Sequence, residues 1–213
     1  KLEGIKTPIL FVDVKGVENK VFGTSYRNEA EANVVVKLLH NFQMNEISGL
    51  QVGVITPYFG QKDLLRKKAA SLYYNDVRIS SVDSFQGSER DYIILSLVRT
   101  NKQGNIGFLA NPNRINVSIT RARRGIIIVG DFDSIVNSNA NGNNMRNQFL
   151  VNMCRFYKEK GAIVSASTIR MIPKRVKPVP ALKIEYRKKE KDDDDDNYKD
   201  DDDDIEYVSD NEN

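Results

Sequence analysis

Two short runs of apolar, mostly β-branched residues constrain the fold of this chain more than any other feature. Residues 92–98 and 125–129 contain almost no polar side chains, and such runs are typical of strands buried on both faces of a parallel sheet. The polar residues between them must then lie at strand ends. Ligands of open α/β sheets bind at the carboxyl ends of the strands, so we expect the Gln86-Gly87 turn and the Arg-rich segment 111–125 to lie at that edge.

Strands and helices alternate along the first 171 residues, which predicts a single α/β domain. The expected strands are residues 9–14, 52–56, 77–82, 91–98, 125–130 and 162–166. The expected helices are residues 28–42, 60–73, 113–123 and 144–160, and residues 137–144 are expected to form an Asn-rich loop. Alternation of this kind implies right-handed β-α-β crossovers, and therefore a largely parallel sheet with helices on both faces.

The charge of the chain is divided unevenly. We expect residues 172–191 to form a basic, Pro-containing linker and residues 192–213 to form an acidic, low-complexity disordered tail. The tail holds thirteen acidic residues and one Lys, a net charge of −12, whereas the whole chain carries +3. Residues 1–191 therefore carry +15. A polyanion is the natural partner of such a surface, although a solvated basic face without a ligand is the alternative.

Single Cys and His residues narrow the possible functions. One of each excludes a Cys/His zinc site and a disulfide framework, and we expect no metal site in this chain. Cys154 lies on an apolar helical face, which predicts a buried structural thiol; His40 stands at a helix end, which predicts a helix-terminal or surface role. No apolar run approaches the length of a membrane span, and the first residues are no signal peptide. We expect no membrane partner and a cytoplasmic location, with the nucleus as the alternative.

Three arginines lie at the entrance to the apolar run 125–129, namely Arg121, Arg123 and Arg124. Phosphoryl transfer spreads negative charge over the transferred group, and an arginine that reaches it across a domain interface stabilises the transition state. The alternative is that these arginines pair with carboxylates or cap a helix. Three arginines within four residues favour the phosphate interpretation.

Several segments together resemble one helicase family. They are residues 23–26, 55–58, 81–89, 106–109 and 116–123, in the order in which the family has them. The second RecA-like domain of superfamily 1 helicases contains such segments, in particular the branch of the nonsense-mediated decay helicase (regulator of nonsense transcripts) and senataxin. The resemblance runs from about residue 8 to about residue 169, and it implies a RecA-like fold of the P-loop NTPase type.

The resemblance also implies residues that bind the nucleotide. Arg121 matches the arginine that contacts the γ-phosphate, which makes it the expected catalytic arginine. Gly87, in the segment 81–89, and Arg123, in the segment 116–123, are also expected to bind the nucleotide. Glu89 matches the glutamate that binds the ribose, and a carboxylate can accept two hydroxyl hydrogen bonds. Its alternative role is that of a surface charge next to Arg90.

A second set of matching positions is expected to hold nucleic-acid phosphates through hydroxyls and backbone amides. These residues are Thr56, Pro57, Ser84 and Gln86. Contacts to phosphates carry no sequence information, which suits a motor that moves along any strand. Two further arginines, Arg99 and Arg114, match positions near the nucleotide and the domain interface, although this chain has Asn113 where the family commonly has another arginine. Tyr58 and Phe59 either stack on a base or pack into the core.

Half of an ATP site is missing from the sequence. A P-loop needs Gly-x-x-x-x-Gly-Lys-Ser/Thr, and the chain contains neither a Gly-Lys pair nor an Asp-Glu pair. We therefore expect the phosphate-binding lysine and the Mg²⁺ ligands on an N-terminal RecA-like domain of the same polypeptide, of which this chain would be a fragment. The expected cofactors are ATP and Mg²⁺.

The resemblance implies an ATP-dependent 5′–3′ RNA helicase of nonsense-mediated decay, with single-stranded RNA and decay factors as partners. The first alternative is a DNA helicase of the same superfamily, since contacts to the 2′-hydroxyl are needed to distinguish RNA from DNA. The second is a non-catalytic RNA-binding module that kept the fold. Arg121 and Glu89 argue against the second alternative, because a module without ATP has little reason to hold both.

The uneven charge generates a first prediction. The chain should bind single-stranded RNA weakly and with a steep salt dependence, and deletion of residues 192–213 should strengthen binding because the acidic tail competes for the basic surface. Fluorescence anisotropy of a labelled oligonucleotide at several salt concentrations measures both effects. Unchanged affinity at low salt after the deletion would show that the tail does not screen this surface.

Overall fold

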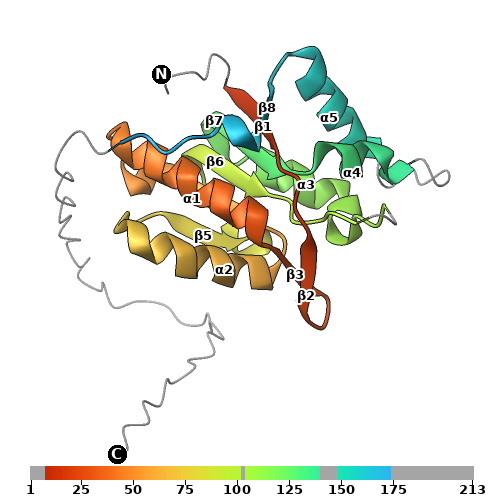
Figure 1. The fold of residues 1–213 in the computed structure, drawn as a ribbon, viewed down its shortest axis with the longest axis horizontal. Coiled ribbons are helices and arrows are strands. Elements are labelled where there is room, and N and C mark those ends of the chain that lie inside the picture. Colours follow the sequence, from red (N-terminus) through yellow and green to blue (C-terminus); the bar gives the residue numbers. More distant parts are fainter. Residues whose placement is uncertain (1–7, 102–103, 140–147, 174–213) are drawn as a thin grey trace, which may run out of the picture. The chain divides into compact units, whose positions relative to one another are not determined.

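The computed structural model describes residues 8–101, 104–139 and 148–173, and Figure 1 shows a sheet between two layers of helices. The chain divides into two units, residues 1–180 and 181–213, and the described residues all belong to the first. The acidic tail, most of the linker and most of the Asn-rich loop lie outside the described residues, so the predictions for them stay predictions.

The central sheet has six strands, all parallel, in the order β5-β4-β6-β7-β1-β8. Its strands are β1 (Ile9–Asp13), β4 (Val52–Thr56), β5 (Arg78–Ser81), β6 (Arg90–Ser96), β7 (Ala122–Gly130) and β8 (Ile163–Ser165). The two apolar runs of the sequence form β6 and β7, which are neighbours at the centre of the sheet. This arrangement confirms the predicted α/β fold with a parallel sheet.

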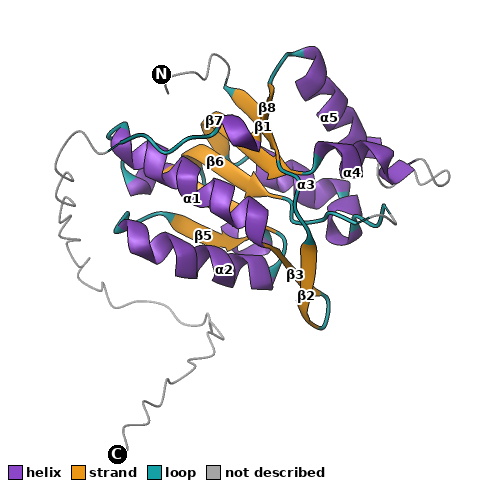
Figure 2. Ribbon diagram, in the orientation of Figure 1, coloured by secondary structure: helices purple, strands orange, loops and turns teal. Residues whose placement is uncertain are grey.

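Helices cover both faces of the sheet, as predicted (Figure 2). The helices on one face are α1 (Glu29–Met44) and α2 (Phe59–Ala69), and those on the other are α3 (Pro112–Ile119), α4 (Phe132–Val136) and α5 (Gln148–Glu159). Successive side chains of a strand point to opposite faces. In β6, Ile93 and Leu95 therefore lie in the core beneath α3 and α5, whereas Ile94 lies in the core beneath α1 and α2. None of the helices described is long and apolar enough to cross a membrane.

Three elements differ from the expectation. The helix expected over residues 113–123 ends at Ile119, and β7 begins at Ala122, because Ala122 pairs with Arg90 in the sheet. The short helix α4 was not predicted. An antiparallel hairpin of β2 (Glu18–Phe22) and β3 (Ser25–Asn28) was also missed; it lies next to the first turn of α2, where Ser25 Oγ accepts a hydrogen bond from Gly60 N at 2.8 Å.

The single Cys and His are both buried. Cys154 has no exposed surface, and burial raises the pKa of its thiol to about 12, which confirms the structural role. Of the two roles predicted for His40, the helix-terminal one agrees with its place near the end of α1. The surface role is wrong, because its ring is buried and Nε2 lies 2.8 Å from the carbonyl oxygen of Ile172. The segment after β8 thereby holds the end of α1.

A buried polar network joins α1, α2 and the end of β6. The carboxyl group of Glu31, in the first turn of α1, accepts hydrogen bonds from Val98 N at 2.9 Å and from Ser96 Oγ at 2.8 Å. Gln61 of α2 donates to the same Ser96 Oγ at 3.0 Å and accepts from Asn28 N at 2.8 Å. Glu31 is fully buried, and burial raises the pKa of its carboxyl group to about 8.

The raised pKa of Glu31 predicts a specific pH dependence of stability. Because the folded-state pKa, about 8, lies above the ordinary value of 4.5, the native state binds more protons between these values than the unfolded state does. The free energy of unfolding should therefore fall as pH rises through this window. Glu31→Gln should flatten the dependence, since the amide carries no charge, while keeping an acceptor for Val98 N.

Urea unfolding at several pH values tests this prediction. Glu31→Ala should destabilise the fold by about 1–3 kcal/mol for each buried donor left without an acceptor. Glu29→Gln, on the same helical turn but exposed and paired with Lys68 at 2.6 Å, is the matched control and should keep the wild-type pH dependence. Equal pH dependence in wild type and Glu31→Gln would contradict the assignment.

Candidate functional site

The residues expected at the nucleotide lie at the amino ends of β6 and β7. Glu89 directly precedes β6 and Arg121 directly precedes β7, and the backbone joins them, because Arg90 N donates to Arg121 O at 3.0 Å. The expectation that the Gln86-Gly87 turn and the Arg-rich segment lie at the carboxyl ends of the strands is therefore wrong. Since β5 and β6 are parallel, the chain must return to the opposite edge of the sheet before β6 can begin.

That return is made by residues 82–89, which we call the crossing segment. It runs beneath α3 and α5, with Val82 and Phe85 buried in the core of that face. Gly53 of β4 leaves the space for Phe85, since a β-carbon there would lie 2.6 Å from the phenyl ring. Gly87 has a backbone φ of +76°, a conformation that glycine adopts without strain, and this confirms the predicted turn.

Arg121 is held at the end of α3. Its Nε donates to Val117 O at 2.9 Å, and its Nη2 lies 3.2 Å from Thr120 Oγ1. Within the part of the chain that the structure describes, no carboxylate pairs with this guanidinium. A helix end is the place where unpaired carbonyl groups accept such bonds, so the helix-capping alternative describes the resting contact of Arg121.

The two arginines that follow have a carboxylate partner. Asp91 accepts a hydrogen bond from Arg123 Nε at 3.1 Å and forms an ion pair with Arg124, whose Nε lies 3.4 Å away. A hydrogen bond from Gln51, together with the charges of the two arginines, lowers the pKa of Asp91. Both arginine side chains remain more than half exposed. Arg123 therefore lies at the same edge as Arg121 and Glu89, but it forms an ion pair with a carboxylate, as the alternative interpretation expects.

Three of the four residues expected to contact nucleic acid, Thr56, Pro57 and Ser84, lie at the opposite edge of the sheet. Thr56 ends β4 and pairs in register with Ser81 at the end of β5, while Ser84 accepts a hydrogen bond from Ser81 Oγ at 2.9 Å. Pro57 follows Thr56 and is half-buried, and Gln86 is exposed farther along the crossing segment. The hydroxyl of Thr56 does not reach the surface as expected: the residue is fully buried, and its Oγ1 has no hydrogen-bond partner among the described residues.

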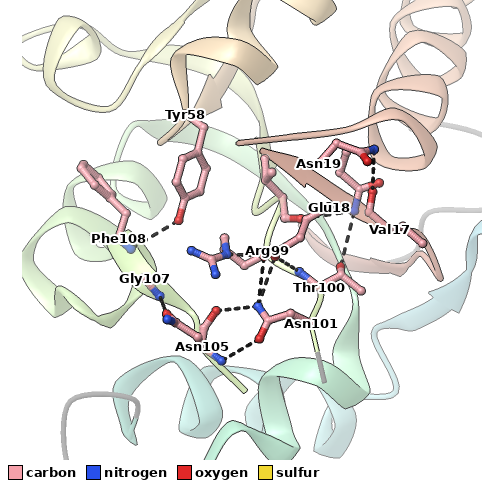
Figure 3. A network of polar contacts seen from close by, with 12 residues as sticks. Val17, Glu18, Asn19, Tyr58, Arg99, Thr100, Asn101, Asn105, Gly107 and Phe108 are labelled. Atoms are coloured by element: carbon pink, nitrogen blue, oxygen red, sulfur yellow. Dashed lines mark hydrogen bonds and ion pairs between the residues drawn. The ribbon is translucent and has the colours of Figure 1, made fainter. Parts of the chain in front are cut away.

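Arg99 lies in a polar cluster beside Glu18 and Tyr58 (Figure 3). It follows the carboxyl end of β6, whereas Arg121 and Glu89 lie at the amino ends, so the expected position of Arg99 near the nucleotide and the domain interface stays a prediction. Its buried guanidinium pairs with Glu18 at 2.9 Å, and its central carbon lies 4.2 Å from the centre of the Tyr26 ring. Burial acts to lower the pKa of Arg99, but hydrogen bonds to Tyr58 and Glu18 outweigh it and the pKa is raised.

Sequence reasoning missed Glu18 because it missed the hairpin that carries it. The signal was the short stretch around Gly23, whose φ of +52° closes the turn between β2 and β3.

Tyr58 is buried and its hydroxyl accepts a hydrogen bond from Phe108 N at 3.3 Å, which favours core packing over stacking on a base. Arg114 lies at the start of α3, 3.6 Å from Asp83 of the crossing segment and 3.7 Å above the Phe108 ring.

The described residues include no group of three His, Cys, Asp or Glu side chains that could hold a metal ion. The amino edge does suit part of a nucleotide. An exposed carboxylate can accept hydrogen bonds from ribose hydroxyls, and an arginine without a carboxylate partner can meet a phosphate. The residues expected at the nucleotide, Glu89 and Arg121, thus lie at the amino edge of the sheet, and those expected to contact nucleic acid, Thr56, Pro57 and Ser84, lie at the carboxyl edge. The crossing segment carries both Ser84 and Glu89.

Comparison with known proteins gives one family. Residues 1–133 match the family described as an AAA domain. The chain is 45% identical over 127 residues to the Regulator of nonsense transcripts 1 homolog of Arabidopsis thaliana, and 38% identical over 167 residues to that of Drosophila melanogaster. It is 38% identical over 151 residues to the ATP-dependent helicase NAM7 of Saccharomyces cerevisiae.

These alignments cover 57%, 75% and 68% of this chain, but only 10%, 13% and 15% of the respective relatives. The chain therefore corresponds to a small part of each relative. The matches confirm the family that the motifs indicated.

Proposed function

Since this chain belongs to the AAA domain family, in the helicase branch of the regulators of nonsense transcripts, we propose that it is the second motor domain of an ATP-dependent RNA helicase. It would act in nonsense-mediated decay and supply half of the ATP site and half of the RNA site. The observation that carries the proposal is that Glu89 and Arg121 lie at the amino ends of two adjacent strands, which a backbone hydrogen bond from Arg90 N to Arg121 O joins.

We propose that the amino edge faces a P-loop domain of the same polypeptide. ATP bound between the two domains would supply the phosphoryl group whose transfer to water drives the motor, with Mg²⁺ held by the other domain. Glu89 would bind the ribose hydroxyls. Arg121 would leave the end of α3 and meet the charge that develops on the transferred group, where a preorganised donor lowers the barrier most.

The crossing segment would connect the two functions. Ser84 lies near the carboxyl edge of the sheet and Glu89 at the amino edge, with the buried Phe85 between them. A displacement of either end would move the other, because a segment anchored in a close-packed core cannot deform freely. The proposed partners are single-stranded RNA, the P-loop domain and decay factors, and the proposed location is the cytoplasm.

A second function is supported by one contact. Arg121 already donates to Val117 O, as it would in a strand-binding module that kept the fold without hydrolysing ATP. Nucleic-acid binding would then persist, while ATP would not be hydrolysed. The same experiment decides between the two functions.

The test is steady-state ATP hydrolysis, at saturating RNA, by a polypeptide that carries this chain together with its P-loop domain. Arg121→Ala should reduce kcat by on the order of 10³- to 10⁵-fold with little change in nucleotide affinity, because the arginine acts mainly in the transition state. Glu89→Ala should mainly raise KM for ATP, since a ribose contact is made in ground and transition states alike.

Arg124→Ala is the matched control, because Arg124 is a neighbouring exposed arginine with a carboxylate partner. It should leave kcat close to that of the wild type. Near wild-type turnover for Arg121→Ala, with a large loss for a neighbouring arginine, would reassign the catalytic role. Absence of ATP hydrolysis by the wild type, with nucleic-acid binding retained, would favour the strand-binding module.

A further inference from the structure

A basic cleft between α2 and β5 lies outside the two edges described so far. Figure 1 shows α2 alongside β5 at the border of the sheet. The cleft has a volume of about 460 Å³, and its lining includes Lys62 and Arg66 from α2, Arg78 and Ser80 from β5, and Ser84 from the crossing segment. Asp76 is the one acidic residue among those that line it. The balance of charge therefore favours an anionic ligand.

The cations of the cleft are not neutralised by the protein itself. Arg66 donates Nε and Nη2 to Ile79 O, at 3.2 and 3.0 Å, and Arg78 donates Nη1 to Ser88 Oγ at 2.7 Å. Within the described residues, Lys62, Arg66 and Arg78 form no ion pair with a carboxylate. Bonds to neutral carbonyl and hydroxyl oxygens position a guanidinium while its positive charge and further N–H donors stay available for an anion.

An exposed aromatic side chain lies at one end of the cleft. Phe59 begins α2 and is 63% exposed, and Lys62, which lines the cleft, places Nζ 4.0 Å from the centre of its ring. Phe59 lies three residues after Thr56, at the carboxyl edge of the sheet. Ser84, which is also expected to contact nucleic acid, lines the same cleft. The cleft is therefore continuous with the site expected for nucleic acid.

A flat apolar ring beside unpaired cations is the arrangement that binds a single nucleic-acid strand, because bases stack on the ring and phosphates meet the cations. We propose that the cleft between α2 and β5 is an additional single-strand site, in which Phe59 stacks on a base and Lys62 and Arg66 hold phosphates. The proposal rests on the proposed function and extends the RNA path beyond Thr56 and Ser84 to the border of the sheet. An acidic polypeptide would meet the same cations but would gain little from the ring.

Four variants of the 213-residue chain test the site, with an oligouridylate of about 15 nucleotides as the probe. Phe59→Ala should weaken binding by between about 5-fold and about 150-fold, the effect of about 1–3 kcal/mol for one base–aromatic stack, and should leave the salt dependence unchanged. Lys62→Ala and Arg66→Gln should each weaken binding and reduce the slope of log K against log salt by about 0.7, the value for one phosphate on a single strand.

Asp76→Asn should strengthen binding, because it removes the one negative charge from the lining. Asp76 has a backbone φ of +68°, and Asn tolerates this conformation, so the fold should be preserved. A gain of affinity cannot arise from misfolding, and this variant keeps the test decisive if Arg66→Gln proves unstable.

The controls lie on the same helix and on the opposite face. Lys67 is an exposed lysine of α2 that does not line the cleft, and Lys67→Ala should leave affinity nearly unchanged. Phe156 is a second exposed phenylalanine, with Lys160 Nζ 5.6 Å from its ring centre on the α5 side of the sheet. Phe156→Ala should have no effect.

The outcomes separate the cleft from the proposed function. Wild-type binding that is unchanged in Phe59→Ala, Lys62→Ala and Asp76→Asn would overturn the cleft site and leave the helicase proposal intact. Effects of the charge variants without an effect of Phe59→Ala would indicate a polyanion site without stacking and would overturn the strand assignment. Failure of the wild type to bind the probe at low salt would overturn both.

Discussion

The carboxyl edge of the sheet depends on the hydrogen bonds of the buried carboxyl group of Glu31. This group binds Val98 N, and Val98 has a backbone φ of +74°, which is unfavourable for a β-branched residue. The backbone strain at Val98 is tolerated because the carboxyl group fixes the amide that such a turn exposes. Arg99 follows directly, and its ion pair with Glu18 holds the hairpin β2–β3. One buried side chain of α1 thus determines where β6 ends and where the hairpin lies.

The two functional edges are separate because the sheet is parallel. A chain that leaves β5 at the carboxyl edge must reach the amino edge before it enters β6, and residues 82–89 cover this distance without a full helix. The buried Phe85 fixes the middle of the crossing segment, so its ends project at opposite edges. Residues close together in sequence, Ser84 and Glu89, therefore serve different ligands in the proposed function. The same geometry explains why a motif that looks continuous in sequence does not form one continuous site.

The sequence predicted elements whose apolar residues are buried on two faces, and it failed where tertiary contacts decide. The runs that form β6 and β7 were predicted because hardly any other element leaves several consecutive apolar residues without a polar face. The edge at which the Gln86-Gly87 turn and the Arg-rich segment 111–125 lie was predicted wrongly, since strand direction relative to a crossing loop is not encoded in local periodicity. The hairpin was missed because four of the five residues of β2 are exposed, so it lacks the alternation that marks a strand. The ion pair of Arg99 was not predicted, because its partner Glu18 lies 81 residues away in sequence.

The contact of Arg121 with α3 is compatible with a role in catalysis. A flexible arginine in water must lose side-chain freedom when it meets a phosphate, and that loss opposes transition-state stabilisation. The bond to Val117 O restricts the guanidinium to the edge where β6 and β7 begin, so part of this entropy is already lost in the folded protein. The bond is to a neutral carbonyl rather than to a carboxylate, and exchanging it for a charged phosphate oxygen is therefore favourable. Arg123 and Arg124 would first have to leave Asp91. Of the three arginines at this edge, Arg121 can thus turn to a phosphate with the smallest electrostatic loss.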